Sequence, residues 1–587
     1  MMLSVRGERA AEGPLTLGQL NVFQWVSDTP DSVNTVLAVD LHIPQGTRLG
    51  DVVEVLDVLL ARHEGLRTTY QGGVFPTQRV LGSGTLPVAV RAVDPPPGPE
   101  QRTALVAALR REVLAAAPAL PTHGLPVRVA VATSRDDPDR VLAATLACTH
   151  LALDEQAAAV VQHEFAEMID DPAARHRGGP RHQPLDQAAE EQTPVARHKA
   201  GAALRHWRRM MPLLPQCLYA APRLAAAGAS VAVRMESQAA AAALLHITAR
   251  ARATRSSVVL AAICAVLARR TGYDRLVFNT VSGNRFDPRL VDYVGSLAQG
   301  CVAGVDTAAA SFDTLVRRAW AGSVQAAANG VFDASERAAL GREANHARGL
   351  DVSCDPLFNC TVVESRGTPS GAAPPLSWLP EARTRTTYQV EQLAPTANLM
   401  RFDLFHLDGA VVLSAWTGDT GRVPVEELRA LLDAVDRLLV GAAEADLDGA
   451  AMDRLIRLAP IPRGPGWLLV DSCWIELAEV QHLVEEALGE QARARVFAEV
   501  GGRPLVAHLV ATDGVRTAEQ AHARCLAMLP GRPTAMTPRR YVVCAAAPDD
   551  PDDPDDPGAW RPVITDGTGR SDDADRLRCP AGTDRSP

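Results

Sequence analysis

A histidine and an aspartate four residues apart could together serve acid–base chemistry. His150 and Asp154 follow a run of apolar, β-forming residues from Val127 to Cys148, which places His150 where a strand ends. Histidine suits proton transfer near neutral pH because its ordinary pKa is about 6.5. Asp154 stands before Glu155 and an apolar run, a pattern typical of a helix N-cap. The pair is compatible with a catalytic base, and also with a strand end followed by a capped helix.

The elements that must position this pair alternate between strand and helix patterns. A strand is expected within 33–43, and a helix follows around 52–59, where valines and leucines recur on one face. Further helices are expected at 101–117 and 155–170. Residues 171–198 are polar and rich in proline, glycine and charge, which predicts a linker between two lobes.

The alternation repeats beyond this stretch. Helices at 238–253 and 256–271 precede a strand at 275–283, and a strand within 409–421 precedes a helix at about 424–441. The sequence therefore predicts a second lobe built on the same plan as the first.

The composition argues against several classes of function. With 47% hydrophobic and 22% charged residues the chain is of the globular type, and a net charge of −10 argues against sequence-independent nucleic-acid binding. Lys199 is the only lysine, so a GxxxxGK[ST] phosphate loop is absent. The ten cysteines form no CxxC or Cys/His cluster, which predicts reduced thiols, no metal site and a cytoplasmic location. The most apolar helical run, Val258 to Ala268, is too short to cross a bilayer, so no membrane segment is expected.

Seven segments of the chain follow one another in a recognisable order: LTLGQLNVF (15–23), RHEGLRTTY (62–70), THLALDE (149–155), HWR (206–208), SSVVLAAICAVLARRTGYDRLVFNTVSGNR (256–285), YVGSLAQGCVAGVD (293–306) and DVSCDPLFNCTVV (351–363). Together they resemble the condensation domain of nonribosomal peptide synthetases, over about residues 15–445. The resemblance implies membership of the acyltransferase group typified by chloramphenicol acetyltransferase. Such proteins have two similarly folded lobes in a V, with the active site in a tunnel between them.

The family's signature, HHxxxDG, corresponds here to Thr149, His150, Asp154 and Glu155. The resemblance implies that His150 is the catalytic histidine and that Asp154 is a positioning residue paired with Arg285. Thr149 and Glu155 depart from the signature. The threonine hydroxyl can still form local hydrogen bonds and is expected to be tolerated. The glutamate could crowd the site, attract a cationic acceptor or simply favour the first turn of a helix. Residues expected to line the tunnel are Ser282, Gly283 and Asn284.

The resemblance also implies a reaction. An acyl group arrives as a thioester on the phosphopantetheine of an acyl or peptidyl carrier protein, and an amine or a hydroxyl attacks it. Positioning supplies most of the rate because both reactants are held in attack geometry. His150 takes the proton from the acceptor or stabilises the adduct. Because the thioester is already activated, the chain is expected to bind no metal or cofactor of its own.

The chain beyond residue 463 carries three segments of another kind: WIELAEVQHLVEEAL (474–488), GGRPLVAHLVA (501–511) and LAMLPGRPTAMTPRRYVVCAAAP (526–548). They resemble the small C-terminal subdomain of adenylate-forming enzymes. The large ATP-binding domain and the lysine that this subdomain normally delivers have no counterpart, so we expect no adenylation and a unit that is either a leftover or a repurposed docking module. An apolar stripe on an expected helix from Ile475 to Leu488 should pack on the second lobe or on another protein.

These patterns predict an α/β (α+β) protein of four parts: an N-terminal condensation lobe at 15–185, a C-terminal condensation lobe at 195–460, an adenylation-subdomain-like unit at 465–570 and a disordered tail at 571–587. The predicted function is that of a free-standing acyltransferase that joins a carrier-bound acyl group to an amine or hydroxyl in natural-product biosynthesis. Two alternatives stay open. One is a catalytically silent module that recruits a carrier protein or tailoring enzyme, and the other is an acyl-CoA-dependent acyltransferase acting on a free small acceptor.

Overall fold

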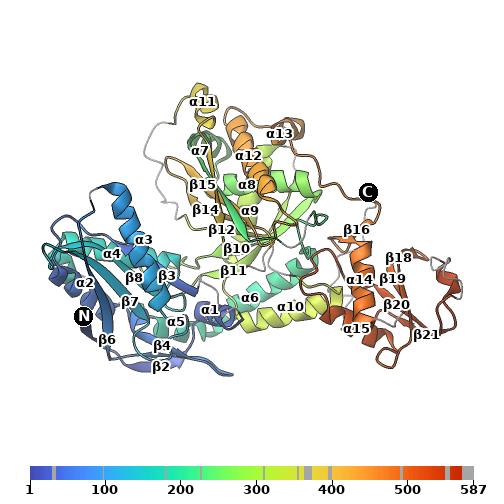
Figure 1. Ribbon diagram of the computed structural model, residues 1–587, viewed down its shortest axis with the longest axis horizontal. Coiled ribbons are helices and arrows are strands. Elements are labelled where there is room, and N and C mark those ends of the chain that lie inside the picture. Colours follow the sequence, from blue (N-terminus) through green and yellow to red (C-terminus); the bar gives the residue numbers. More distant parts are fainter. Residues whose placement is uncertain are drawn as a thin grey trace. The chain divides into compact units, whose positions relative to one another are not determined.

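The computed structural model describes residues 1–570 except for 29–34, 97, 177, 179–181, 225–227, 309–310, 353–355, 363–372, 394–398, 490–492 and 549–555. The predicted tail, 571–587, lies outside the described residues. Figure 1 labels the helices and strands of the chain, coloured along the sequence. The chain divides into two compact units. Unit 1 comprises Met1–Leu204, Ser282–Gln299 and Asn329–Glu336, and unit 2 comprises Arg205–Val281, Gly300–Ala328 and Arg337–Pro587.

Unit 1 is built on a five-stranded sheet in the order β1-β6-β7-β8-β3. Its strands are β1 (Met2–Arg6), β6 (Ser83–Val93), β7 (Val127–Ser134), β8 (Val141–Thr149) and β3 (Val36–Leu41). β6 and β7 are parallel, and the other neighbours are antiparallel. A separate small sheet joins β2 (Ala11–Pro14), β5 (Thr77–Val80) and β4 (Thr68–Gln71).

Helices cover both faces of the five-stranded sheet because the side chains on both of its faces are apolar. In β7, Val129 and Val131 share a core with α2 (Leu49–Arg62) and α4 (Glu155–Asp170). Ala130 and Ala132 face the opposite way and pack with α3 (Pro99–Ala116). Successive side chains of a strand point to opposite faces of the sheet, and in β7 both sets are apolar and buried, so both faces of the strand are covered.

The polar stretch 171–198 is not a simple linker. It contains a short 3₁₀ helix (Pro172–His176), α5 (Pro184–Glu191) and the first residues of α6 (Pro194–Met210). Polar contacts hold α5 in unit 1: Asp186 pairs with Arg9 at 2.8 Å, and Glu191 accepts a hydrogen bond from the backbone N–H of Leu17. Leu17 begins α1 (Leu17–Asp28). The charged residues that suggested a loop therefore anchor a helix.

Unit 2 contains a seven-stranded sheet in the order β11-β10-β12-β14-β15-β9-β13. The strands are β11 (Gln299–Asp306), β10 (Arg275–Ser282), β12 (Leu357–Cys360), β14 (Arg401–His406), β15 (Val411–Thr417), β9 (Val231–Ser237) and β13 (Thr387–Gln392). Its helices include α7 (Gln238–Ala251), α8 (Arg255–Thr271), α9 (Phe312–Ala328), α10 (Ala334–Arg348), α11 (Leu379–Arg383), α12 (Val425–Ala442) and α13 (Gly449–Ile456).

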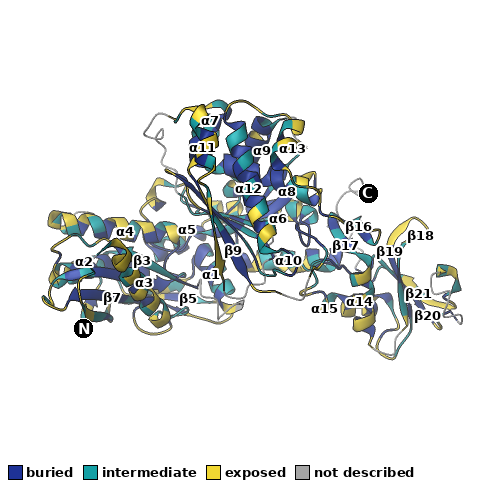
Figure 2. Cartoon of the chain, turned by 45° about the horizontal axis from the view of Figure 1, so that its top comes forward, coloured by how far each residue is buried: buried dark blue, intermediate teal, exposed yellow. Residues whose placement is uncertain are grey.

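The central helix of unit 2 is α8, and its sequence explains its burial. Thr254 caps its first turn, the apolar run from Val258 to Leu267 is buried all round, and Gly272 ends it with φ +80°. Figure 2 shows buried residues concentrated in α8 and its neighbours. Among the described helices none is by itself long and apolar enough to cross a membrane; α7 and α8 reach that length and composition only as a pair bent by 100°.

The C-terminal segment of unit 2 forms a hairpin of β16 (Trp467–Val470) and β17 (Cys473–Glu476), followed by a sheet in the order β18-β19-β20-β21. The sheet strands are β18 (Ala494–Val500), β19 (Arg503–Val510), β20 (Arg540–Cys544) and β21 (Val563–Gly567). α14 (Leu477–Leu488) and α15 (Ala518–Ala527) share one core with this sheet.

The expected helix from Ile475 to Leu488 is wrong at its start. Ile475 lies in β17, and α14 begins at Leu477 because Cys473–Glu476 pairs with β16. The apolar stripe packs mainly into the segment's own core, and Leu350 joins it from outside the segment.

Buried polar contacts tie this C-terminal segment to the rest of unit 2. The guanidinium of Arg348, which is fully buried, pairs with Asp471 at 3.0 Å and donates to the carbonyls of Met211 and Leu214 at 2.7 Å. The Gln216 side-chain amide donates to two carbonyls near residues 532–535. The predicted boundaries between parts, at 185/195 and 460/465, stay a prediction.

Candidate active site

His150 follows the last residue of β8. Its backbone N–H donates to the carbonyl of Thr35 at 2.8 Å, so the turn after the strand is held in place. The imidazole meets the ring of Trp25, in α1, edge to face at 5.6 Å between centroids. Its Nδ1 is buried and has no hydrogen-bond partner among the described residues.

Burial sets the protonation state of His150. Desolvation lowers the pKa of its imidazole below the ordinary value, against smaller opposing effects of its own backbone and of the Asp154 and Glu155 carboxylates. The side chain is therefore neutral near pH 7. A neutral imidazole can accept a proton, which is the property a general base needs.

Asp154 both caps α4 and holds a buried ion pair. Its Oδ1 accepts from the Ala157 N–H at 2.9 Å and from Arg285 at 2.7 Å, and its Oδ2 accepts from Arg285 at 2.8 Å. The N–H groups of Leu297 and Ala298 also donate to Oδ2, at 2.9 and 3.1 Å. Both charged side chains are almost fully buried, at 1% and 6% exposed. The expected pairing of Asp154 with Arg285 is present.

The Arg285 guanidinium also binds the loop around it. It donates to the carbonyls of Gly283 and Gly295 at 3.1 and 3.0 Å, and its centre lies 6.0 Å from the ring of Tyr293. These contacts, with the Asp154 pair, explain why Ser282–Gln299 belongs to unit 1 although its neighbours in sequence belong to unit 2.

The two departures from the family signature are accommodated without strain. The Thr149 hydroxyl donates to the Ala119 carbonyl at 2.5 Å and accepts from the Leu151 N–H at 3.3 Å, so it is bonded locally as expected. Glu155 is the exposed first residue of α4, and its φ is not positive. The backbone at this position therefore does not require glycine.

The predicted tunnel residues are largely engaged within unit 1. The Ser282 hydroxyl donates to Asn284 Oδ1 at 2.7 Å, and Asn284 Nδ2 donates to the carbonyls of Leu297 and Gly330 at 2.8 and 3.0 Å. Both side chains are buried. A Cβ at Gly283 would lie 2.4 Å from the Gln156 side chain. Their role as tunnel wall stays a prediction.

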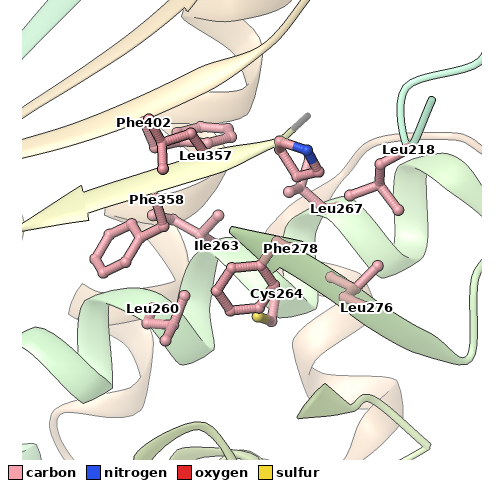
Figure 3. A pocket seen from close by; sticks show the side chains of 11 residues that line it. Leu218, Leu260, Ile263, Cys264, Leu267, Leu276, Phe278, Leu357, Phe358 and Phe402 are labelled. Carbon is pink, nitrogen blue, oxygen red and sulfur yellow. The ribbon is translucent and has the colours of Figure 1, made fainter. Parts of the chain in front are cut away.

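An apolar cavity lies elsewhere, in the core of unit 2 (Figure 3). The cavity is small, because the centre of a water molecule can occupy only about 10 Å³ of it. No predicted site residue lines it. The phenylalanine rings and aliphatic chains that point into it offer no hydrogen-bond partner, and the space is that of about one water molecule. It is a packing gap rather than a substrate site. The lining residues are Leu218, Leu260, Ile263, Cys264, Leu267, Leu276, Phe278, Pro356, Leu357, Phe358 and Phe402.

No group of three or more His, Cys, Asp or Glu among the described residues could hold a metal ion. The eight described cysteines form no disulfide with one another, and among them only Cys360 is not fully buried.

Sequence reasoning missed two parts of the site. One is Trp25, although it lies only two residues beyond the LTLGQLNVF segment. The other is the pair of backbone N–H groups at Leu297 and Ala298, for which side-chain identity carries no signal.

Comparison with known proteins supports the fold. No family model matches the chain, and no curated protein matches it. Solved structures do. SgcC5 from Streptomyces globisporus is 20% identical with a TM-score of 0.55, covering 74% of this chain and 100% of that one. A condensation domain that mediates chain release from the enacyloxin polyketide synthase is also 20% identical with a TM-score of 0.55, covering 78% and 85%. The X-domain from teicoplanin biosynthesis is 16% identical with a TM-score of 0.54, covering 76% and 98%. The chain therefore has the mixed α/β fold of condensation domains.

Proposed function

We propose that this chain is a condensation-type acyltransferase that forms an amide, or an ester, between a carrier-bound acyl thioester and an amine or hydroxyl acceptor. The observation that carries the proposal is a neutral histidine, His150, at the end of β8, beside an aspartate that a buried arginine holds in place. The condensation-domain fold supports it. The chain's own thiols and its single lysine are not needed.

In the proposed reaction the acceptor nitrogen attacks the thioester carbonyl, and His150 takes the proton from that nitrogen as the new bond forms. Nδ1 is buried, so Nε2 is the nitrogen assigned to this step. The carbon–sulfur bond then breaks, and the phosphopantetheine thiolate of the carrier protein leaves and collects the proton. Asp154 and Arg285 do not touch the reactants; they set the position of the turn that carries His150.

The test is intact-protein mass spectrometry of acyl-loaded carrier proteins that are incubated with an amine, in the presence and in the absence of this protein. The buffer is reducing, as in the cytoplasm, the compartment that we propose for it. We expect loss of the acyl group from the carrier and formation of the amide. His150→Ala should lower turnover about 10²- to 10⁴-fold with the fold retained. His163→Ala is the matched control, since His163 lies exposed on α4. Near-wild-type turnover in the His150 variant would refute the role of His150 as the general base. Acyl transfer from acyl-CoA without a carrier protein would identify the CoA-dependent alternative.

A second function is favoured by particular observations. Thr149 and Glu155 depart from the signature, and one structure with this fold is a complex of the X-domain and OxyB from teicoplanin biosynthesis. We therefore keep, as the second proposal, a silent module that recruits a carrier protein or a tailoring enzyme. Carrier binding without any acyl transfer would support it over the acyltransferase.

A further inference from the structure

The imidazole of His150 forms no hydrogen bond with another described side chain. A catalytic or metal-binding histidine is commonly oriented by a hydrogen bond at the ring nitrogen that does not react. Here Nδ1 is buried and has no hydrogen-bond partner in another described residue, and the backbone of His150 itself supplies the hydrogen bond that acts on the ring. The Thr149 hydroxyl is directed to Ala119, and both Asp154 oxygens are occupied by Arg285 and backbone N–H groups. Because no other described side chain holds the ring by a hydrogen bond, packing contributes to its position.

Trp25 is the aromatic ring that packs against His150. The two rings are nearly perpendicular, at 86°, with centroids 5.6 Å apart, which is a favourable edge-to-face arrangement. The indole is itself well placed, because Val22 and Val26 of the same helix are buried in one cluster with Leu151, the residue after His150.

The start of α1 is also secured. Thr16 and Gln19 exchange hydrogen bonds across its first turn, and Glu191 accepts from the Leu17 N–H at 2.7 Å. The helix that presents Trp25 is thus fixed at its beginning by polar contacts and along its length by apolar ones.

We propose that Trp25 is a positioning residue, which holds the His150 imidazole in the rotamer that directs Nε2 toward the acceptor. This inference rests on the proposed function for its catalytic meaning, but the restraint on the ring is a property of the protein that can be measured without any acyl transfer. The packing of Trp25 adds to the orientation that the backbone of His150 gives the ring.

The first experiment measures the restraint directly. Diethyl pyrocarbonate modifies neutral imidazole, and peptide mass spectrometry gives the rate at His150 alone. Trp25→Leu, which removes the ring but keeps apolar bulk, should raise that rate about three- to tenfold, the factor that corresponds to one aromatic pair. Trp25→Phe should stay close to wild type. Phe23→Leu is the matched control because Phe23 is a half-buried ring on the same helix. An unchanged rate in Trp25→Leu, or an equal rise in Phe23→Leu, would overturn the proposal.

The second experiment separates positioning from substrate binding. With active protein, Trp25→Leu should lower kcat about three- to tenfold and leave KM for the acceptor unchanged, and Trp25→Phe should restore kcat. A rise in KM at constant kcat would refute positioning and make Trp25 a substrate contact. If the wild type transfers no acyl group, the proposed function fails on its own assay, while the modification rates still decide whether Trp25 restrains His150.

Discussion

The substitution Asp154→Asn separates two roles that one side chain combines. Asparagine caps a helix about as well as aspartate, so the hydrogen bond to Ala157 can survive. The amide nitrogen that replaces Oδ2, however, meets three donors: one from Arg285 and the N–H groups of Leu297 and Ala298. A guanidinium that is 6% exposed then lacks its counter-charge. Removing one partner of a buried ion pair costs about 3–5 kcal/mol.

His150→Ala provides the comparison within the same turn. It removes one aromatic contact, about 0.5–1.5 kcal/mol, and also removes a buried nitrogen that has no partner. We therefore expect Asp154→Asn to lower the free energy of unfolding by about 4 kcal/mol, and His150→Ala to lower it by about 1 kcal/mol. At roughly 2–4 °C per kcal/mol for a unit of this size, Tm should fall by about 8–16 °C in the first variant.

The assay is urea denaturation followed by circular dichroism, with thermal melting as a second measure. Asp448→Asn is the matched control: Asp448 caps α13 through the Ala451 N–H, lies exposed and has no ion pair among the described residues. It should be nearly neutral. If Asp154→Asn loses no more stability than His150→Ala or Asp448→Asn, Asp154 is an N-cap and the Arg285 pair is energetically unimportant.

Three further predictions concern other parts of the chain. Burial raises the pKa of Glu191 to about 7, so ionisation of this carboxyl opposes folding, and the free energy of unfolding should fall as pH rises from about 4.5 through 7. In urea unfolding, the stability of Glu191→Gln relative to wild type should therefore rise by up to ~3 kcal/mol between pH 5 and pH 8. A difference that does not depend on pH would contradict this. Arg348→Met removes the buried guanidinium that pairs with Asp471 and donates to the carbonyls of Met211 and Leu214, while Arg539 stays 3.4 Å from the same carboxylate. Because hydrogen bonds from a charged group contribute about 1.5–3 kcal/mol each, unit 2 should lose about 3–5 kcal/mol of stability. The C-terminal segment and the remainder of the unit should lose resistance to proteolysis together; separate loss would show two independent units. The full chain should give no ATP–pyrophosphate exchange with any amino acid. Truncation after Arg463 should expose apolar surface around Leu350 and remove Asp471 from Arg348, so unit 2 should lose stability while the turn of His150, in unit 1, keeps its acyl-transfer chemistry. A truncated protein that is as stable as the full chain and binds every partner would show the segment to be dispensable.

Local patterns predicted most secondary structure, because they depend on residues close in sequence. The helix expected at 155–170 is Glu155–Asp170, and those expected at 238–253 and 256–271 are Gln238–Ala251 and Arg255–Thr271. The failures share a cause. Ile475 became part of a strand by pairing with Leu468, and the polar residues near 186–191 became a helix because Arg9 and Leu17 supply partners from the start of the chain.

By itself the sequence determined the elements and the family-like segments, including the placement of His150 at a strand end and of Asp154 at a helix start. Through its resemblance to condensation domains, the sequence also predicted that Asp154 pairs with Arg285. Only the tertiary structure decided that both Asp154 oxygens are saturated, that Trp25 lies on His150, that residues 282–299 join unit 1, and that the C-terminal segment is bound to unit 2 through Arg348. The physical reason is that a helix or strand follows from spacing along the chain. Backbone N–H groups, ring contacts and buried charges find their partners in space, more than a hundred residues away in the case of Trp25 and His150.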